Sequence, residues 1–225
     1  MAVADSSYLF RLIDVGAPGR MSDDGVFKRS PIGQRLHSGL LGLPSSQQLP
    51  GSEASLPYVL IGDEAFQLRE DFLRPYPGSR ESPAERSFNY RLSRARWRCV
   101  ENAFGILTAR FRIFRGPIKL KPDNAERVVK AACVLHNFLC VECRNSSAYC
   151  PVGYADHEDS FGNIIAGSWR SETAADTSTF ALQATHARKS KSSAQGVRDL
   201  YAQFFANEGQ VPWQWNLLDI TEPDT

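Results

Sequence analysis

Short apolar runs closed by glycine or aspartate predict strands near the start of the chain. Residues 9–15 form one such run and are followed directly by Gly16, a pattern typical of a mostly buried strand. Residues 1–5 have the pattern of the end of a further strand. Residues 58–62 lead into Asp63, as in a buried strand of an α/β sheet.

Helical periodicity and capping residues predict helices between and after these strands. Residues 16–57 are rich in Gly, Ser and Pro, which indicates a loop containing a short helix near residues 25–36. Residues 88–111 form a long amphipathic segment that opens at Ser87, a good N-cap. Its expected core residues are Leu92, Ala95, Cys99, Ala103 and Ile106. A short strand is expected within residues 114–120.

The last core helix is predicted at residues 124–141, with Asp123 as its cap. Its expected apolar face consists of Val128, Ala131, Ala132, Leu135, Phe138 and Leu139.

After the fifth cysteine the composition shifts to Ser, Ala, Thr and Asp, which disfavours a packed core. We therefore interpret residues 1–145 as the folded domain and residues 146–196 as a flexible linker. Residues 197–225 then form a C-terminal helix and a tail that contains tryptophan.

Composition narrows the class of protein without identifying a partner. The 225 residues are 42% hydrophobic and carry a formal net charge of +1. No apolar run reaches the roughly 18 residues that would predict a membrane span, and the first residues lack the pattern of a secretory signal peptide. The five cysteines are odd in number and follow no secreted framework, so we expect free thiols in a reducing compartment.

Two carboxylates are candidate metal ligands. Asp63 follows a strand, at the edge where open α/β sheets bind ligands. Glu101 lies within an apolar and basic helix, with Arg94, Trp97 and Arg98 at helical spacing on its face. Carboxylate oxygens bind Mg²⁺, and paired metal ions activate water against a phosphodiester. The residues alone leave two alternatives open, which are a turn-capping aspartate and a surface glutamate in ordinary ion pairs.

The segment around Glu101 is strongly basic. Residues 86–121 hold ten Lys or Arg and a single acid, which gives this segment a formal charge of +9. Such a concentration favours salt-dependent contact with phosphates. The alternative is a solvated basic face balanced by acidic neighbours elsewhere in the fold. The candidate nucleic-acid-binding residues are four arginines of the helix, Arg91, Arg94, Arg96 and Arg98.

Three blocks of the sequence resemble the PIF/Harbinger family of DDE transposases. Gly62-Asp63-Glu64-Ala65-Phe66, followed by Arg74-Pro75-Tyr76, is similar to the second-aspartate block of the family. Residues 88–96 lead into Val100-Glu101-Asn102-Ala103-Phe104, which resembles its catalytic-glutamate helix. Ala132-Cys133-Val134-Leu135-His136 resembles its closing helix.

Further matches extend the resemblance along the chain. Asp14-Val15-Gly16-Ala17-Pro18 is similar to the strand and loop that precede the second aspartate. Gly167-Ser168-Trp169-Arg170 and Val211-Pro212-Trp213-Gln214 resemble tail motifs of animal members. The similarity to the nuclease domain itself spans residues 5–142.

The resemblance implies a DDE nuclease with an RNase H-like fold, which is an α/β architecture of a mixed sheet flanked by helices. Asp63 would be its second acidic ligand and Glu101 its third. Both would be catalytic and would bind Mg²⁺ or Mn²⁺ for the hydrolysis of DNA phosphodiester bonds. The family further implies DNA as substrate, a Myb-like DNA-binding partner protein, and a location in the nucleus with the cytoplasm as a second location, whereas no membrane association is expected because no apolar run is long enough.

One block of the family has no counterpart in this sequence. The first aspartate of the family lies in an Asp-Gly-x-His block, whereas Asp24-Gly25 is not followed by histidine. We therefore expect an N-terminally truncated nuclease domain that lacks the first strand and the first carboxylate. Two functions stay open, which are a metal-dependent nuclease impaired by truncation and a catalytically inactive DNA- or protein-binding module derived from the same fold.

Two further groups have more ordinary interpretations. A zinc site is one interpretation of a histidine and three cysteines near the end of the last core helix, namely His136, Cys140, Cys143 and Cys150. The i, i+4 placement of the first two on an apolar helix favours free thiols and structural hydrogen bonds instead. Trp213 and Trp215 are expected to anchor the tail onto the protein rather than to stack on bases.

Overall fold

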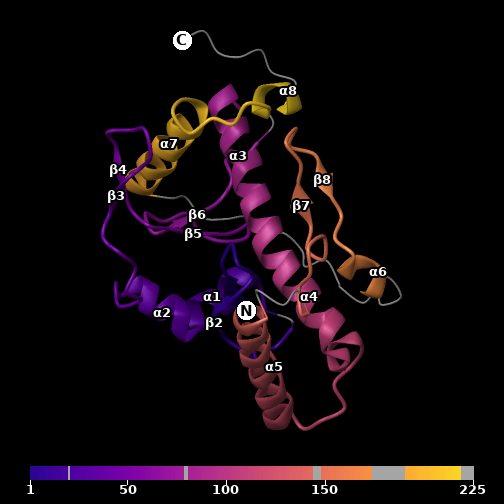
Figure 1. Cartoon of the computed structure of the whole chain (residues 1–225). Helices are drawn as coiled ribbons and strands as arrows, with labels where there is room; N and C mark the ends of the chain where they lie inside the picture. The colour runs from indigo at the N-terminus through magenta and orange to yellow at the C-terminus, as the bar shows by residue number, and fades with distance from the viewer. Residues whose placement is uncertain (20, 79–80, 144–147, 174–190, 219–225) are drawn as a thin grey trace. The chain divides into compact units, whose positions relative to one another are not determined.

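The chain folds into two compact units, each assembled from two separate stretches of sequence. A computed structural model describes residues 1–19, 21–78, 81–143, 148–173 and 191–218. The first unit comprises Met1–Met21 and Trp97–Leu182, and the second comprises Ser22–Arg96 and Gln183–Thr225. Both contain helices and short strands (Figure 1), so the chain is of mixed α/β class, as the sequence predicted. No described helix is long and apolar enough to cross a membrane.

In the first unit, strand β1 (Ala2–Ala4) pairs antiparallel with strand β2 (Phe10–Ile13). The Asp5 carboxylate accepts hydrogen bonds from the backbone N–H groups of Ser7 and Leu9, at 2.8 and 3.1 Å, and so shapes the turn between the strands. Both strands predicted at the start of the chain are therefore confirmed, although β2 is shorter than the predicted run.

Helix α5 (Pro122–Glu142) packs on β2 through polar bonds as well as apolar contacts. The Asn137 side chain accepts from Phe10 N–H and donates to Phe10 C=O, both at 2.9 Å, and so pairs with β2 as another strand would. His136 is fully buried and contacts the Tyr8 carbonyl and the Tyr149 hydroxyl, each at 2.9 Å. His136 therefore has the structural role that the sequence indicated.

The apolar face predicted for this helix is partly wrong. The residues of α5 that are buried are Ala132, Cys133 and His136, whereas Leu135 and Phe138 are 50% and 57% exposed. The bonds of Asn137 and His136 set the rotation of the helix, because buried polar groups need partners whereas an apolar side chain tolerates water. The helix also begins at Pro122, which makes Asp123 a residue of its first turn and not its cap.

The long helix predicted at residues 88–111 is interrupted by a π-helical turn. Helix α3 (Pro83–Arg96) ends where the π-turn η1 (Trp97–Glu101) begins, and α4 (Asn102–Arg110) follows. Ala103 and Ile106 of α4 are fully buried as expected, whereas Ala95 is exposed. A π-turn adds a residue to the helical repeat, so one periodicity does not run through the segment.

The remaining elements of the first unit lie on both sides of α5 in the sequence. Instead of the strand expected within residues 114–120, a 3₁₀-helix, η2 (Arg112–Arg115), follows α4. Strands β7 (His157–Glu158) and β8 (Ile164–Ile165) form an antiparallel hairpin, and helix α6 (Trp169–Thr173) follows. These three elements lie within the stretch interpreted as a linker, of which residues 174–190 fall outside the described residues.

In the second unit, two short helices share Ser30 as a joint. Helix α1 (Asp23–Arg29) ends at Ser30, and α2 (Pro31–His37) begins there. The Ser30 hydroxyl donates to Phe27 C=O and accepts from Gly33 N–H, at 2.7 and 2.9 Å. Serine caps and a proline at the first helical position are expected in such a joint. The helix predicted near residues 25–36 is therefore a pair of helices.

Two pairs of short strands follow in the second unit. Strands β3 (Gln47–Gln48) and β4 (Ser55–Leu56) pair antiparallel, and β5 (Leu60–Ile61) pairs parallel with β6 (Phe72–Leu73). The strand before Asp63 is thus confirmed, but it is not fully buried, since Ile61 is 38% exposed. Among the described residues, β5 pairs with one strand, β6.

Helix α3 forms the centre of the second unit and begins earlier than predicted. Ser82 and Glu85 form a capping box, because Ser82 N–H donates to the Glu85 carboxylate at 2.8 Å and Glu85 N–H donates to the Ser82 hydroxyl at 3.3 Å. Ser87 is therefore a buried residue within the helix rather than its cap.

The C-terminal part of the chain packs on this helix. Figure 1 shows helix α7 (Ser192–Ala206) beside the N-terminal end of α3, with α8 (Gln214–Leu218) near the same end. The core between α3 and α7 includes Phe88 and Ala202. The predicted C-terminal helix is confirmed.

We expect Asn137→Ala to lower the free energy of unfolding by about 1–3 kcal/mol, because it leaves the Phe10 backbone groups without their partner. Denaturant unfolding measures this change. Asn124→Ala, at an exposed position of the same helix, is the control and should change stability by less than about 0.5 kcal/mol. Equal effects of the two substitutions would show that β2 does not depend on Asn137.

Candidate functional site

Glu101 occupies an irregular position in the backbone. It is the last residue of the π-turn η1, and its side chain is 44% exposed. Turns of this type occur often at functional sites, where they direct a side chain out of the regular helical repeat. The sequence placed Glu101 within a regular helix beside Arg94 and Arg98. The structure gives it a different ion-pair partner, Arg170, from the start of α6.

Arg170 joins two carboxylates in the first unit. Its Nε and Nη2 atoms donate to the two oxygens of Asp156 at 2.8 and 2.7 Å, which is a bidentate pair. Nη2 also lies 3.5 Å from Oε2 of Glu101, as a longer ion pair. The guanidinium stacks over the rings of Trp169 and Trp97, at 4.5 and 5.5 Å from their centroids. The hydrogen bond to Asp156 raises the pKa of Arg170, so its positive charge is permanent.

Asp156 is the buried end of this arrangement. Its side chain has no exposed surface, and its Oδ1 also accepts from Gly167 N–H at 2.6 Å. An ionised carboxylate without water is stable only when it is paired and hydrogen-bonded. Arg170 and the Gly167 amide supply these partners. Two residues of the Gly167-Ser168-Trp169-Arg170 motif, Gly167 and Arg170, therefore bind the Asp156 carboxylate.

Asn102, the residue next to Glu101, ties the same segment to α4. Its Oδ1 accepts from Asp156 N–H and from Trp169 Nε1, both at 2.8 Å. Its Nδ2 donates to the carbonyls of Arg98 and Asp156, at 2.9 and 3.1 Å. The Trp169 ring covers Gly105, where a Cβ atom would lie 2.6 Å from ring carbons. Asn102 is fully buried and all its bonding positions are used.

Sequence reasoning missed the roles of Asn102, Asp156 and Arg170. The Gly-Ser-Trp-Arg motif was a signal for one of them, but its separation from Glu101 along the chain concealed the contact. Asp156 lies in a stretch whose composition resembles that of a flexible linker, and nothing in the sequence marks it as buried.

Asp63 lies directly after β5 in the second unit and is half-buried. Its Oδ1 accepts from Ala65 N–H at 3.0 Å, so it does cap a turn, as one interpretation of the sequence proposed. Burial and the nearby negative charge of Asp63 raise the pKa of Asp23. Asp63 and Glu101 belong to different units and each is positioned by its own surroundings. No group of three or more His, Cys, Asp or Glu with metal-binding geometry occurs among the described residues.

The four arginines predicted to bind nucleic acid differ in their surroundings. Arg91 donates to the Gly209 carbonyl at 3.2 Å and stacks on the Phe205 ring, and Arg94 stacks on Tyr90. Both are half-buried within the second unit, as is Arg96. Arg98 belongs to the first unit and is exposed. Arg91 and Arg94 therefore contribute to packing as well as to charge.

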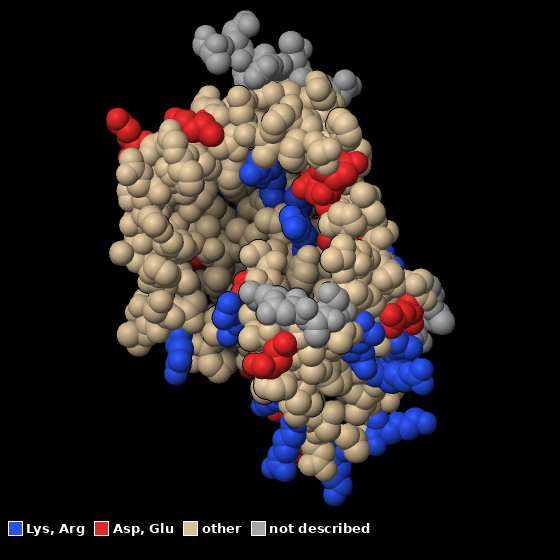
Figure 2. Space-filling view, viewed as in Figure 1, with Lys and Arg blue, Asp and Glu red and all other residues tan. Residues whose placement is uncertain are grey.

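A more exposed set of cations lies in the first unit, after α4. Figure 2 shows Lys and Arg gathered over the end of α4, the segment that follows it and the start of α5. The exposed members are Arg112, Lys119, Lys121 and Arg127. Arg110 and Arg115 instead point inward, since Arg110 donates to the Tyr149 carbonyl and Arg115 to that of Ala109, at 2.7 and 2.6 Å.

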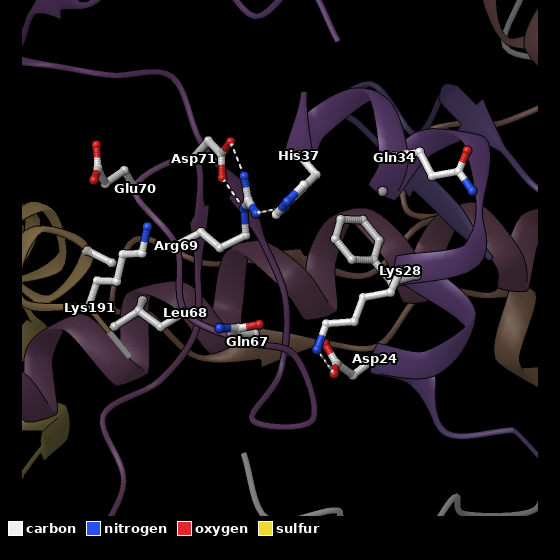
Figure 3. Close-up of a pocket in the computed structure, with 13 residues that line it drawn as sticks. Asp24, Lys28, Gln34, His37, Gln67, Leu68, Arg69, Glu70, Asp71 and Lys191 are labelled. Carbon is white, nitrogen blue, oxygen red and sulfur yellow. Dashed lines mark hydrogen bonds and ion pairs between the residues drawn. The ribbon is translucent and has the colours of Figure 1, made fainter. Parts of the chain in front are cut away.

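The second unit also contains a cavity of about 840 Å³. Figure 3 shows Arg69 in its wall between Asp71 and His37, with Lys28 against Asp24. Arg69 donates to both oxygens of Asp71, at 2.6 and 3.0 Å, and Lys28 lies 2.6 Å from Asp24. These charges are already paired within the wall. Asp63 is not among the residues that line the cavity.

The structure shows the surroundings of the cysteines, of His136 and of Trp215. All five cysteines are free thiols, and His136 uses its ring nitrogens for structural hydrogen bonds. Trp215 is 6% exposed and its indole N–H donates to the Gln210 side chain at 3.1 Å. It therefore anchors the C-terminal segment within the second unit, as expected.

Comparison with known proteins supports a nuclease ancestry. Residues 1–137 match the family model described as DDE superfamily endonuclease. The protein named "Putative nuclease HARBI1" of Mus musculus is 27% identical over 140 residues, and its Homo sapiens and Bos taurus counterparts are 26% identical over the same length. Each match covers 61% of this chain but only 36% of the relative, so the chain spans well under half the length of these curated relatives. No solved structure gives a significant match.

Asn102→Ala should release the segment that carries Asp156, because it leaves buried donors of Asp156 and Trp169 unpaired at about 1–3 kcal/mol each. Hydrogen exchange measures this release. Relative to the unsubstituted protein, the exchange rates of the variant should increase in residues 154–170 by more than they do in α5. A variant whose exchange in this segment matches the unsubstituted protein would contradict the anchoring role of Asn102.

Proposed function

Because the chain belongs to the DDE superfamily endonuclease family, we propose that it forms part of a metal-dependent DNA endonuclease domain with an RNase H-like core. Asp63 and Glu101 would be two of its acidic metal ligands. The observation that carries this proposal is the placement of Glu101, an exposed carboxylate at a π-turn inside the matched region. Its neighbour Arg170 is bonded to the buried carboxylate of Asp156, and Asn102 is bonded to the Asp156 backbone, so both hold the surrounding backbone in place.

The two carboxylates have the chemistry that Mg²⁺ or Mn²⁺ requires. Asp63 uses Oδ1 in a turn, and Glu101 turns Oε2 toward Arg170. Among the described residues, no hydrogen bond engages the other oxygen of either side chain, so each retains an oxygen donor. Hard divalent cations prefer such donors. When bound, the cation would activate water and stabilise the leaving oxygen of a phosphodiester.

The exposed cations of the first unit support DNA as the substrate. Arg98, Arg112, Lys119 and Lys121 are exposed, and they belong to the same unit as Glu101. Lysine and arginine side chains in such a cluster can neutralise successive phosphates. A Myb-like partner protein and a nuclear location are further parts of this proposal, and they rest on the family resemblance.

A second function is favoured by the same cations. A catalytically inactive module would bind DNA through the exposed Lys and Arg side chains without any divalent cation. The two functions differ in the role of Asp63 and Glu101. In the nuclease these carboxylates are needed for cleavage, whereas in the binding module their negative charge only opposes the binding of phosphates.

We expect Glu101→Gln and Asp63→Asn each to reduce nicking of supercoiled plasmid in Mn²⁺ by more than the roughly 10–100-fold typical of losing an outer-shell partner of a metal site. Glu64→Gln, an exposed neighbour of Asp63, is the control and should retain activity. Cleavage that survives both carboxylate substitutions would refute the assignment of the ligands. DNA binding with no nicking in Mg²⁺ or Mn²⁺ would favour the second function.

Arg112→Gln combined with Lys121→Gln should weaken DNA binding, because fewer phosphates of the duplex are then neutralised. The slope of log affinity against log salt should fall by about 1 for each phosphate that the variant no longer neutralises. Fluorescence anisotropy with a labelled duplex in EDTA measures both quantities. The control is Arg29→Gln with Arg35→Gln, which removes the same charge from exposed positions of the second unit. An equally large effect in the control would mean that net charge alone determines binding.

A further inference from the structure

We propose that Arg170 is a positioning residue that orients the Glu101 carboxylate for a divalent cation. This inference rests on the proposed function, in which Glu101 is a metal ligand. It adds a residue that lies outside the family-matched region of residues 1–137. The residues that carry it, Glu101, Asp156 and Arg170, all belong to the first unit.

The position of the Arg170 guanidinium is fixed independently of Glu101. Both of its bonds to Asp156 are short, at 2.7 and 2.8 Å, and the Asp156 side chain has no exposed surface. Stacking against Trp169 and Trp97 restricts the plane of the guanidinium. A planar group held by a bidentate bond and by two rings has little freedom to rotate.

The charge of Arg170 is largely offset by Asp156. An isolated arginine 3.5 Å from Glu101 would oppose a cation at the same carboxylate. The bidentate pair with Asp156 is formally neutral, so the guanidinium presents an N–H donor to Glu101 with little added positive charge. Arg170 can therefore restrain Oε2 and leave Oε1 available as a metal donor.

The backbone that carries the two residues is also coupled. Asn102 follows Glu101 directly and bonds to both backbone groups of Asp156, at 2.8 and 3.1 Å. Trp97 begins the π-turn that Glu101 ends, and it contacts the guanidinium. These contacts fix the position of the π-turn relative to the Asp156–Arg170 pair. Partners that orient metal-binding side chains in this way typically contribute about 10–100-fold in metal affinity.

Titration of the whole chain with Mn²⁺, followed by calorimetry, tests this role without relying on cleavage. The main variant is the double substitution Asp156→Asn with Arg170→Gln, which removes both charges and leaves no buried carboxylate unpaired. We expect its Mn²⁺ affinity to fall by about 10-fold or more. Arg170→Lys, which retains the charge but loses the planar fork, should give an intermediate affinity.

The matched control is Asp5→Asn with Arg11→Gln. It removes another Arg–Asp pair of the first unit, and Arg11 is 62% exposed. Its Mn²⁺ affinity should equal that of the unsubstituted protein. Thermal unfolding of each variant separates weakened binding from loss of the fold, and tryptophan fluorescence reports whether Trp97 and Trp169 keep their surroundings.

The possible outcomes separate this inference from the proposed function. If Glu101→Gln leaves Mn²⁺ affinity unchanged, the assignment of Glu101 as a ligand fails, and the role of Arg170 fails with it. If Glu101→Gln weakens binding but the folded double variant binds Mn²⁺ normally, only the role of Arg170 is overturned. Tighter Mn²⁺ binding by the double variant would also overturn it, since Arg170 would then compete with the cation.

Discussion

The arrangement around Glu101 depends on the neutralisation of one buried carboxylate. Asp156 has no exposed surface, so its charge requires Arg170 and the Gly167 amide. Those bonds place Arg170 beside Glu101, and the backbone of Asp156 engages the side chain of Asn102. These bonds, together with the packing of Trp169 and Tyr154 on α4, attach the hairpin and the short helix α6 to α4. The cost of burying a charge thus determines the surroundings of the proposed metal ligand.

The π-turn provides a second constraint, because it lies where the two units meet along the chain. The second unit includes the chain up to Arg96, and the π-turn begins at Trp97. Glu101 ends this turn and Asn102 begins the next α-helix. The Glu101 carboxylate therefore extends from an irregular turn. The side chain of Asn102 stabilises this turn by donating to the Arg98 carbonyl. Such a position is suited to a side chain that must meet a ligand rather than fill a core.

Elements defined by local pattern were predictable from the sequence. The strands at the start of the chain, the strand before Asp63 and the C-terminal helix all appear near their predicted positions, because strand periodicity, turn residues and helical amphipathicity act over a few residues. Element boundaries were less predictable. The capping box at Ser82 begins α3 five residues before Ser87, the predicted cap, because Glu85 completes the box and Pro83 occupies the first helical position.

By itself, the sequence indicated the family and the α/β class and singled out two candidate carboxylates, because the motifs behind each are encoded in contiguous residues. Only the tertiary structure decided which side of α5 is buried and which cation faces Glu101. Leu135 and Phe138 are exposed since the bonds of His136 and Asn137 set the rotation of the helix. Arg170 meets Glu101 across many intervening residues because buried Asp156 needs a partner. Such pairings depend on distances in space, which the order of residues does not contain.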